Sequence, residues 1–314
     1  MRVIRYRTCL RYCLLTLAIC ACSKDAAAPT PALREAGKLD DKPSATGAGV
    51  AISAPGLPEA RSYPDLGAAL IAIIPADARV IGFGELHART DRAQVTSSLA
   101  SFTRALPAIA DQLSDLLLET WLVDPACGKA AVQATAKIET TMKRPEATKS
   151  EIAELAAAAR AAHIQPHAMT LTCADYARVV ARPAGAGSAD REVDAVAMLT
   201  LTTRELTRIA TSAVAHRDKQ PSHRPWIAVY GGALHNDRFP DAAVAEWSYA
   251  AAVDRVTGGR FVEVDVIVPE LAAGDPVMQR QPWFPLVGAP RDPARPVVVW
   301  TRGERSFVVV LPPT

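Results

Sequence analysis

The sequence has few aromatic residues and no excess of charge of either sign. Aromatic side chains make up 5% of its 314 residues, which does not favour a stacking platform for bases or sugars. The net charge is only +2, and no basic stripe is interleaved with aromatics, so we expect no nucleic-acid partner. No internal repeat of fixed period is present. The remaining composition, 49% apolar and 22% charged, is normal for a folded, soluble domain.

The N-terminus also lacks an apolar run long enough to cross a membrane. Basic residues precede an apolar stretch over residues 12–21, about ten residues, which fits a secretory signal rather than a membrane span. The stretch closes on Ile19-Cys20-Ala21-Cys22, which resembles the lipobox of bacterial lipoproteins. We expect a signal peptide over residues 1–22 and a lipid anchor on Cys22 that attaches the protein to the membrane. Modification of Cys20 instead, or cleavage without lipidation, are the alternatives. The expected location is the bacterial cell envelope, at the outer membrane or its periplasmic face, or the periplasm or exterior if no lipid is attached.

Cysteine is almost absent beyond this segment. Only Cys127 and Cys173 remain, and an exported protein lies where disulfides persist. Two cysteines allow one pairing, and the turn signal Asp124-Pro125 before Cys127 is a natural place for one end of a bridge. A disulfide between them is one of two open predictions, two free thiols being the other.

Three parts follow from the pattern along the chain. Residues 23–58 are rich in Ala, Pro, Gly and Thr without periodicity, which predicts a flexible tether. From residue 59 to 314 strands and helices alternate, which predicts a single α/β domain. Its fold class is a mainly parallel central sheet with helices on both faces and a C-terminal antiparallel hairpin that turns at Gly303. The expected strands are 79–84, 114–121, 164–171, 226–230, 261–268, 297–300 and 306–311, and the expected helices are 63–74, 92–113, 129–163 and 190–216.

Glu85 and His87 are the most informative residues in the chain. They stand two positions apart directly after the predicted strand 79–84, so in extended geometry both side chains point to one side. A carboxylate beside an imidazole is the minimum equipment for general base catalysis or for holding a metal ion. A structural role, capping a helix that begins near Asp91, is the alternative.

Two further strands end in reactive side chains. Glu119 closes the predicted strand 114–121, and His235 follows Gly231 and Gly232 after another strand. In open α/β sheets, ligands bind beyond the carboxyl ends of the strands, so these side chains are expected to share one pocket with Glu85 and His87. As alternatives, Glu119 caps a strand end and His235 occupies a turn.

The ordered set of these motifs resembles a known superfamily. The segments Gly84-Glu85-Leu86-His87, Leu118-Glu119 and Gly232-Ala233-Leu234-His235 are similar in order to those of the superfamily that unites erythromycin esterases, ChaN-like haem-binding lipoproteins and Tiki/TraB proteins. The ChaN-like lipoproteins are the most similar branch. The resemblance implies that Glu85, His87, Glu119 and His235 carry esterase or metal-dependent peptidase activity, or line a haem-binding cleft. Ala88-Arg89-Thr90 departs from the esterase pattern, which argues against a macrolide substrate.

The leading interpretation is therefore a hydrolase of ester or peptide bonds, with His87 as base and Glu85 as its orienter. Glu119 and His235 complete the site as acid, oxyanion partner or metal ligands, so all four are candidate catalytic residues and candidate metal ligands. The cofactor stays open between a divalent metal, haem and none. The competing interpretations are a lipoprotein that binds haem or another small molecule without catalysis, and a member of the family with a structural role only.

Overall fold

The computed structural model describes residues 49–52, 56–122, 124–180 and 193–314. Residues 44–314 belong to one compact unit. The predicted signal peptide, its lipidation site Cys22 and the Gly/Ala/Pro stretch 182–189 lie outside the described residues. Within the described ones, no helix has the length and apolar character needed to cross a membrane.

Strands and helices alternate through most of the described chain. The strands are β1 (Val50–Ile52), β2 (Ala60–Tyr63), β3 (Val80–Glu85), β4 (Leu113–Leu118), β5 (Gln165–Ala168), β6 (Trp226–Gly232), β7 (Phe261–Ile267), β8 (Val297–Gly303) and β9 (Ser306–Val310). The α-helices are α1 (Leu66–Ile73), α2 (Ser98–Ala105), α3 (Gly128–Thr141), α4 (Ala147–Ala161), α5 (Cys173–Val179), α6 (Ala195–Lys219), α7 (Ala233–Asn236), α8 (Ala250–Thr257) and α9 (Pro269–Ala273).

The strands of the described chain form one sheet in the order β1-β2-β8-β9-β7-β3-β6-β4-β5. Every pairing from β9 to β5 is parallel, whereas β8 pairs antiparallel with β9 and with β2, and β1 pairs antiparallel with β2. This confirms the predicted mainly parallel sheet with a C-terminal antiparallel hairpin. Because β3 lies between β6 and β7, the carboxyl ends of these three strands meet at one edge.

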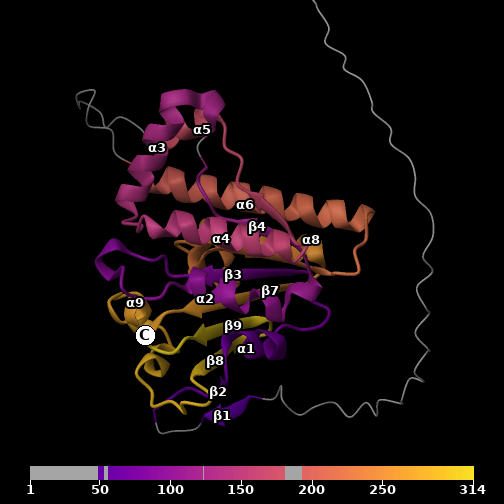
Figure 1. Cartoon of the computed structure of the whole chain (residues 1–314), viewed down its shortest axis with the longest axis vertical. Coiled ribbons are helices and arrows are strands. Elements are labelled where there is room, and N and C mark those ends of the chain that lie inside the picture. Colours follow the sequence, from indigo (N-terminus) through magenta and orange to yellow (C-terminus); the bar gives the residue numbers. More distant parts are fainter. Residues whose placement is uncertain (1–48, 53–55, 123, 181–192) are drawn as a thin grey trace, which may run out of the picture. The chain divides into compact units, whose positions relative to one another are not determined.

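Helices cover both faces of the sheet, as predicted. One face packs on α1, α2 and α4, and the other packs on α6 and α8, with α9 over the β8–β9 end. The helices α3 and α5 lie together beside α6, at the end of the unit away from β1 and β2 (Figure 1).

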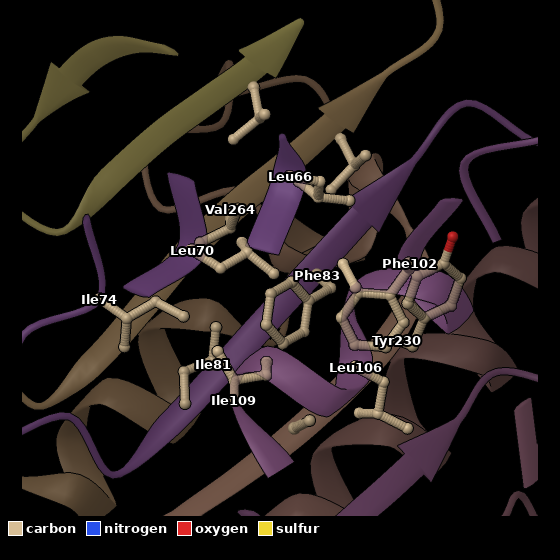
Figure 2. Packing of buried hydrophobic residues seen from close by; sticks show 14 of the residues in the cluster. Leu66, Leu70, Ile74, Ile81, Phe83, Phe102, Leu106, Ile109, Tyr230 and Val264 are labelled. Carbon is tan, nitrogen blue, oxygen red and sulfur yellow. The ribbon is translucent and has the colours of Figure 1, made fainter. Parts of the chain in front are cut away.

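The core next to the edge where the carboxyl ends of β3, β6 and β7 meet contains a row of aromatic rings (Figure 2). The ring of Phe102 on α2 lies with its centroid 4.6 Å from that of Phe83 on β3 and 4.9 Å from that of Tyr230 on β6. Such pairs add to the free energy gained from burial alone. They fix α2 against the two strands and hold Tyr230 in place.

Several element boundaries differ from the sequence predictions. The predicted helix 92–113 is reduced to α2, because Ser97 caps its start by accepting from the Ala100 amide at 2.9 Å and Pro107 lies in a 3-10 turn just after its end. The predicted helix 129–163 is split into α3 and α4 by residues 142–146, and the long helix α6 begins at Ala195 rather than at 190.

The predicted end of the tether and the predicted position of the hairpin turn both differ from the structure. Val50–Ile52 forms the edge strand β1 on β2, so these residues are not part of a tether as predicted for residues 23–58. Three residues are too few for a visible alternation in the sequence, and the pairing with β2 decides their conformation. In the C-terminal hairpin, Gly303 is the last residue of β8, and the turn is made by Glu304 and Arg305, with Arg305 at φ +58°.

Candidate functional site

A cavity of about 460 Å³ opens at the carboxyl edge of the sheet. Its lining includes residues that end or follow β3, β4, β6 and β7, which is where open α/β sheets bind ligands. All four residues singled out in the sequence contribute to this lining: Glu85, His87, Glu119 and His235. Sequence reasoning therefore placed them in one cavity correctly.

Glu85 and His87 form a hydrogen-bonded pair on the α2 side of this edge. The Nδ1 atom of His87 lies 2.8 Å from Oε1 of Glu85, and the Tyr230 hydroxyl donates to Oε2 of Glu85 at 2.7 Å. Because an ionised carboxylate only accepts, the contact places a proton on Nδ1 of His87. In the neutral ring Nε2 then carries the lone pair, which is the tautomer a general base needs.

Glu119 is held as an anion at the bottom of the site. Its Oε2 accepts the Gly232 amide at 2.7 Å, and its Oε1 lies 3.6 Å from His87 Nε2. Burial is the largest influence on the Glu119 pKa and raises it, but His235, His87 and Arg144 together hold the pKa well below its usual range. The lowered pKa favours the ionised form of Glu119 near neutral pH.

Gly231 makes room for Glu119 to approach β6. A Cβ atom at position 231 would lie 2.5 Å from Oε2 of Glu119, closer than real Cβ contacts. At the next position a Cβ on Gly232 would lie 3.0 Å from Nε2 of His87. The glycine pair thus allows a carboxylate and an imidazole to pack directly on the strand end.

Arg144 is a residue of this site that sequence reasoning missed. Its Nη2 donates to His87 Nε2 at 2.8 Å and lies 3.5 Å from Oε1 of Glu119. It stands in the turn between α3 and α4, where Lys143 adopts φ +52° and the Lys143 carbonyl accepts the Thr90 amide at 2.8 Å. A tertiary contact of this kind leaves no spacing signal in the sequence.

The pKa of His87 reflects opposing neighbours. Burial, the largest influence, and the Arg144 charge lower it, but the hydrogen bonds to Glu119 and Glu85 and the Glu119 charge outweigh both and leave the pKa above its ordinary value. Since a guanidinium only donates, the 2.8 Å contact with Arg144 requires Nε2 to be unprotonated. Protonation of His87 and its contact with Arg144 therefore exclude one another.

His235 enters the cavity from α7, directly after β6. Its Nδ1 lies 2.9 Å from the Trp247 carbonyl oxygen and 2.9 Å from the Thr203 hydroxyl, which itself donates to the same carbonyl at 2.8 Å. A carbonyl only accepts, so Nδ1 carries a proton, and in the neutral ring Nε2 of His235 carries the lone pair. The predicted alternative of a turn residue without a role in a pocket is not what the structure has.

The side chains of the site do not fit a metal ion as they stand. In the part of the chain that the structure describes, no three His, Cys, Asp or Glu side chains form a group able to hold one. The Arg144 guanidinium contacts both His87 Nε2 and Glu119 Oε1, so a positive charge already lies beside the two groups that a cation would bind. We derive no chemical step through a metal.

Four further histidines and Arg89 do not line the cavity. His167 on β5 bonds Asp115 at 2.9 Å, and His163 lies at the end of α4 with φ +58°, so the two do not share a helix. His216 and His223 are exposed. Arg89 is half-exposed and pairs with Asp91 at 2.9 Å, as an ordinary surface arginine does.

The predicted cysteine pair is bonded. Cys127 and Cys173 form a disulfide with their Cα atoms 5.1 Å apart, which joins the start of α3 to the start of α5. A small apolar cluster beneath it includes Ala131, Ala134 and Tyr176. The bridge thus supports the module whose following turn delivers Arg144.

A larger cavity of about 520 Å³ lies between α1, α2 and the C-terminal segment. No histidine, cysteine or glutamate is among the described residues that line it. The acid and imidazole groups gather in the cavity at the strand ends, which makes that cavity the candidate active site. Comparison of the chain with protein-family models, with curated proteins and with solved structures finds no match.

Proposed function

We propose that this chain is an exported hydrolase of ester or peptide bonds, with His87 as the general base and Glu85 as its orienter. The observation that carries the proposal is the 2.8 Å contact between Glu85 and Nδ1 of His87, which leaves Nε2 as the basic nitrogen at the cavity. The likeness of segments 84–87 and 232–235 to the erythromycin esterase, ChaN and Tiki/TraB superfamily supports the same reaction class.

The chemistry proceeds in two proton transfers. Nε2 of His87 takes a proton from water as the water oxygen attacks the substrate carbonyl carbon. His87 then returns that proton to the leaving oxygen or nitrogen as its bond to the carbonyl carbon breaks. The products are a carboxylic acid and an alcohol or amine.

Arg144 stabilises the charge that develops on the carbonyl oxygen. In the structure, Nη2 of Arg144 donates to His87 Nε2. When a substrate binds, this donor shifts to the carbonyl oxygen, and the Nε2 lone pair of His87 becomes free to accept a proton from water. Glu119, an anion 3.5 Å from Arg144, keeps the guanidinium in place, and His235 positions the substrate through Nε2.

The test is hydrolysis of a panel of esters and peptides by wild type, His87→Ala and His167→Ala. His167 is a matched control because it is also a carboxylate-bonded histidine, but it lies outside the cavity. We expect His87→Ala to lose at least roughly 10²-fold in kcat/KM and His167→Ala to retain activity. Equal activity of the two variants contradicts the proposal.

A ligand-binding role without catalysis is the second candidate. It is favoured by Nε2 of His235, an imidazole nitrogen of the kind that ligates haem iron, beside a cavity with apolar walls. His235 would hold the iron and Met198 and Trp283 would line the macrocycle. Titration with haemin tests this role: a Soret shift that His235→Ala abolishes supports it, and no shift at micromolar protein rejects it.

We also propose that the domain is lipid-anchored at Cys22 in the cell envelope. The Cys127–Cys173 disulfide supports export, because such bonds persist in oxidising compartments. Labelled fatty acid should be incorporated into the wild-type chain expressed in bacteria and not into Cys22→Ser. Equal labelling of both chains would refute the assignment.

A further inference from the structure

The candidate active-site cavity contains more negative than positive groups. Two arginines face it, Arg144 and Arg302, and a larger number of carboxylates line it: Glu85, Glu119, Asp237, Asp241 and Asp265. A cavity with such an excess attracts cations. Which carboxylate is available depends on how each is already paired.

Most of these carboxylates have partners. Glu119 has Arg144, and Glu85 has His87 and the Tyr230 hydroxyl. Asp237 takes Nη1 of Arg302 at 2.6 Å, and Arg302 also lies 3.4 Å from the buried Glu263 beside the cavity. Both arginines of the cavity therefore already form ion pairs with other carboxylates.

Asp265 on β7 is the exception. Within the described residues no Lys, Arg or His nitrogen forms an ion pair with it, and its one side-chain donor is Nδ2 of Asn236, 3.1 Å from Oδ1. Burial, followed by the charge of Glu263, raises the pKa of Asp265 well above its usual range. The protein thus leaves this cavity-lining carboxyl without the cation that would stabilise its charge.

One oxygen of the neighbouring Asn236 has no hydrogen-bond donor among the described residues. Asn236 is 1% exposed, its Nδ2 donates to the Gly82 carbonyl at 3.0 Å, and its Oδ1 is buried without a hydrogen-bond partner. Both acceptor oxygens lie against Gly84, where an added Cβ would sit 2.3 Å from Oδ1 of Asp265 and 2.6 Å from Oδ1 of Asn236. Of the two side chains Asp265 is the one that lines the cavity, so a ligand that donates a hydrogen bond would meet the Asp265 carboxyl.

The position of this pair relates it to the reaction. Asp265 is the direct β7 partner of Gly84, the residue before Glu85, and neighbouring strands lie about 4.8 Å apart. A group bound at Asp265 is therefore within the length of a small molecule from His87. The rest of the lining is largely apolar and includes Trp121, Trp283, Met198, Met278, Ile267 and Val308.

We propose that the cavity binds an ester or amide whose apolar body carries a protonated amine, with the ammonium group seated on Asp265. The ammonium N–H donates to the Asp265 carboxylate, and the apolar body packs on the tryptophan and methionine walls while the carbonyl lies at Arg144. This substrate class rests on the hydrolase function proposed above.

The test compares two esters of one shape. 2-(Dimethylamino)ethyl benzoate is a cation near neutral pH, and 3-methylbutyl benzoate has a C–H in place of its N–H. Equilibrium binding of each is measured with His87→Ala protein, so the result does not depend on turnover. If no ester is cleaved by wild type, the hydrolase function fails while the cation site is still tested.

We expect the cationic ester to bind at least roughly tenfold more tightly than the neutral one, because a hydrogen bond between charged groups contributes that much to affinity. Asp265→Asn, which keeps the size and removes the charge, should abolish this preference and leave the affinity for the neutral ester unchanged. Asp241→Asn is the control, because Asp241 is exposed at the rim, where water screens its charge, and the preference should persist.

Three results overturn the proposal: equal affinity for the two esters, no binding of either, or a preference that survives Asp265→Asn. Thermal unfolding checks that each variant is folded. Asp265→Ser removes the same charge with a smaller side chain and is used if the asparagine variant does not fold.

Discussion

At the scale of single residues, Arg144 is central to the proposed chemistry. Its guanidinium contacts both His87 and Glu119, and in the proposed reaction it polarises the substrate carbonyl. Arg144→Ala should lower kcat by roughly 10²–10³-fold with little change in thermal unfolding, as loss of an oxyanion donor does. Arg144→Lys keeps the charge but not the planar donor geometry, so we expect only partial recovery. Full activity of Arg144→Ala in steady-state kinetics would exclude this role.

The raised pKa of Asp265 predicts how stability depends on pH. Burial and the neighbouring carboxyl of Glu263 are its causes, with Asp237 adding to them and Arg302 opposing them. When the folded pKa is raised, the group favours folding below its unfolded pKa of about 4, and this contribution is lost as the pH rises through the folded value. The stability of Asp265→Asn relative to wild type should therefore increase with pH above about 4, by up to about 1.4 kcal/mol per pH unit. Urea unfolding at several pH values measures this, and a difference that does not vary with pH would contradict it.

Sequence reasoning succeeded at the residues that strand ends deliver. Glu85, His87, Glu119 and His235 follow apolar strands, and parallel strands bring such ends to one edge. Arg144 was not predictable, because it reaches the site from the turn between two helices. Asp265 left a signal that could have been used: two acids, at 263 and 265, alternate within an otherwise apolar buried strand, where carboxylates are rare unless they have a role.

At the scale of elements, long apolar runs predicted β3, β4, β6 and β7 because these strands are buried on both faces. The short strands β1 and β2 were missed, since the pairing of β2 with β8 and of β1 with β2 determines them and their own sequence does not. The weak strand candidate at 164–171 became the edge strand β5, where Pro166 is tolerated because an edge strand leaves one side unpaired. The predicted helix boundaries differ from the observed ones where a capping residue starts a helix or a proline follows its end, as Ser97 and Pro107 do at α2.

The disulfide gives a prediction for the α3–α5 module. Cys127 and Cys173 are 46 residues apart in sequence, and bonds that close loops of this size stabilise proteins by about 2–4 kcal/mol. The double variant Cys127→Ser/Cys173→Ser should lose stability of this order in urea unfolding. It should also lose hydrogen-exchange protection in α3 and α5 before the central strands do. Unchanged protection in these two helices would show that the bridge does not hold the module.

At the scale of the whole molecule, strand order creates the site. With β3 between β6 and β7, the chain places Glu85, the Gly231–Gly232 pair and Asp265 on adjacent strands, and β4 beside β6 adds Glu119. The helices on both faces then close the cavity from the α3–α4 turn with Arg144 and from α6 with Thr202. The site thus depends on the fold as a unit, and His87, the proposed base, lies at its centre.

The pH dependence of kcat/KM in wild type and Glu85→Gln tests this account most directly. In wild type, activity should rise through the His87 pKa, which Glu85 and Glu119 hold above its ordinary value. Glu85→Gln removes one of these anions, so the acidic limb should shift to lower pH while the maximal rate falls by roughly 10²-fold or more. An acidic limb at the same pH, or an undiminished rate in Glu85→Gln, would show that the pair of Glu85 and His87 does not carry the reaction.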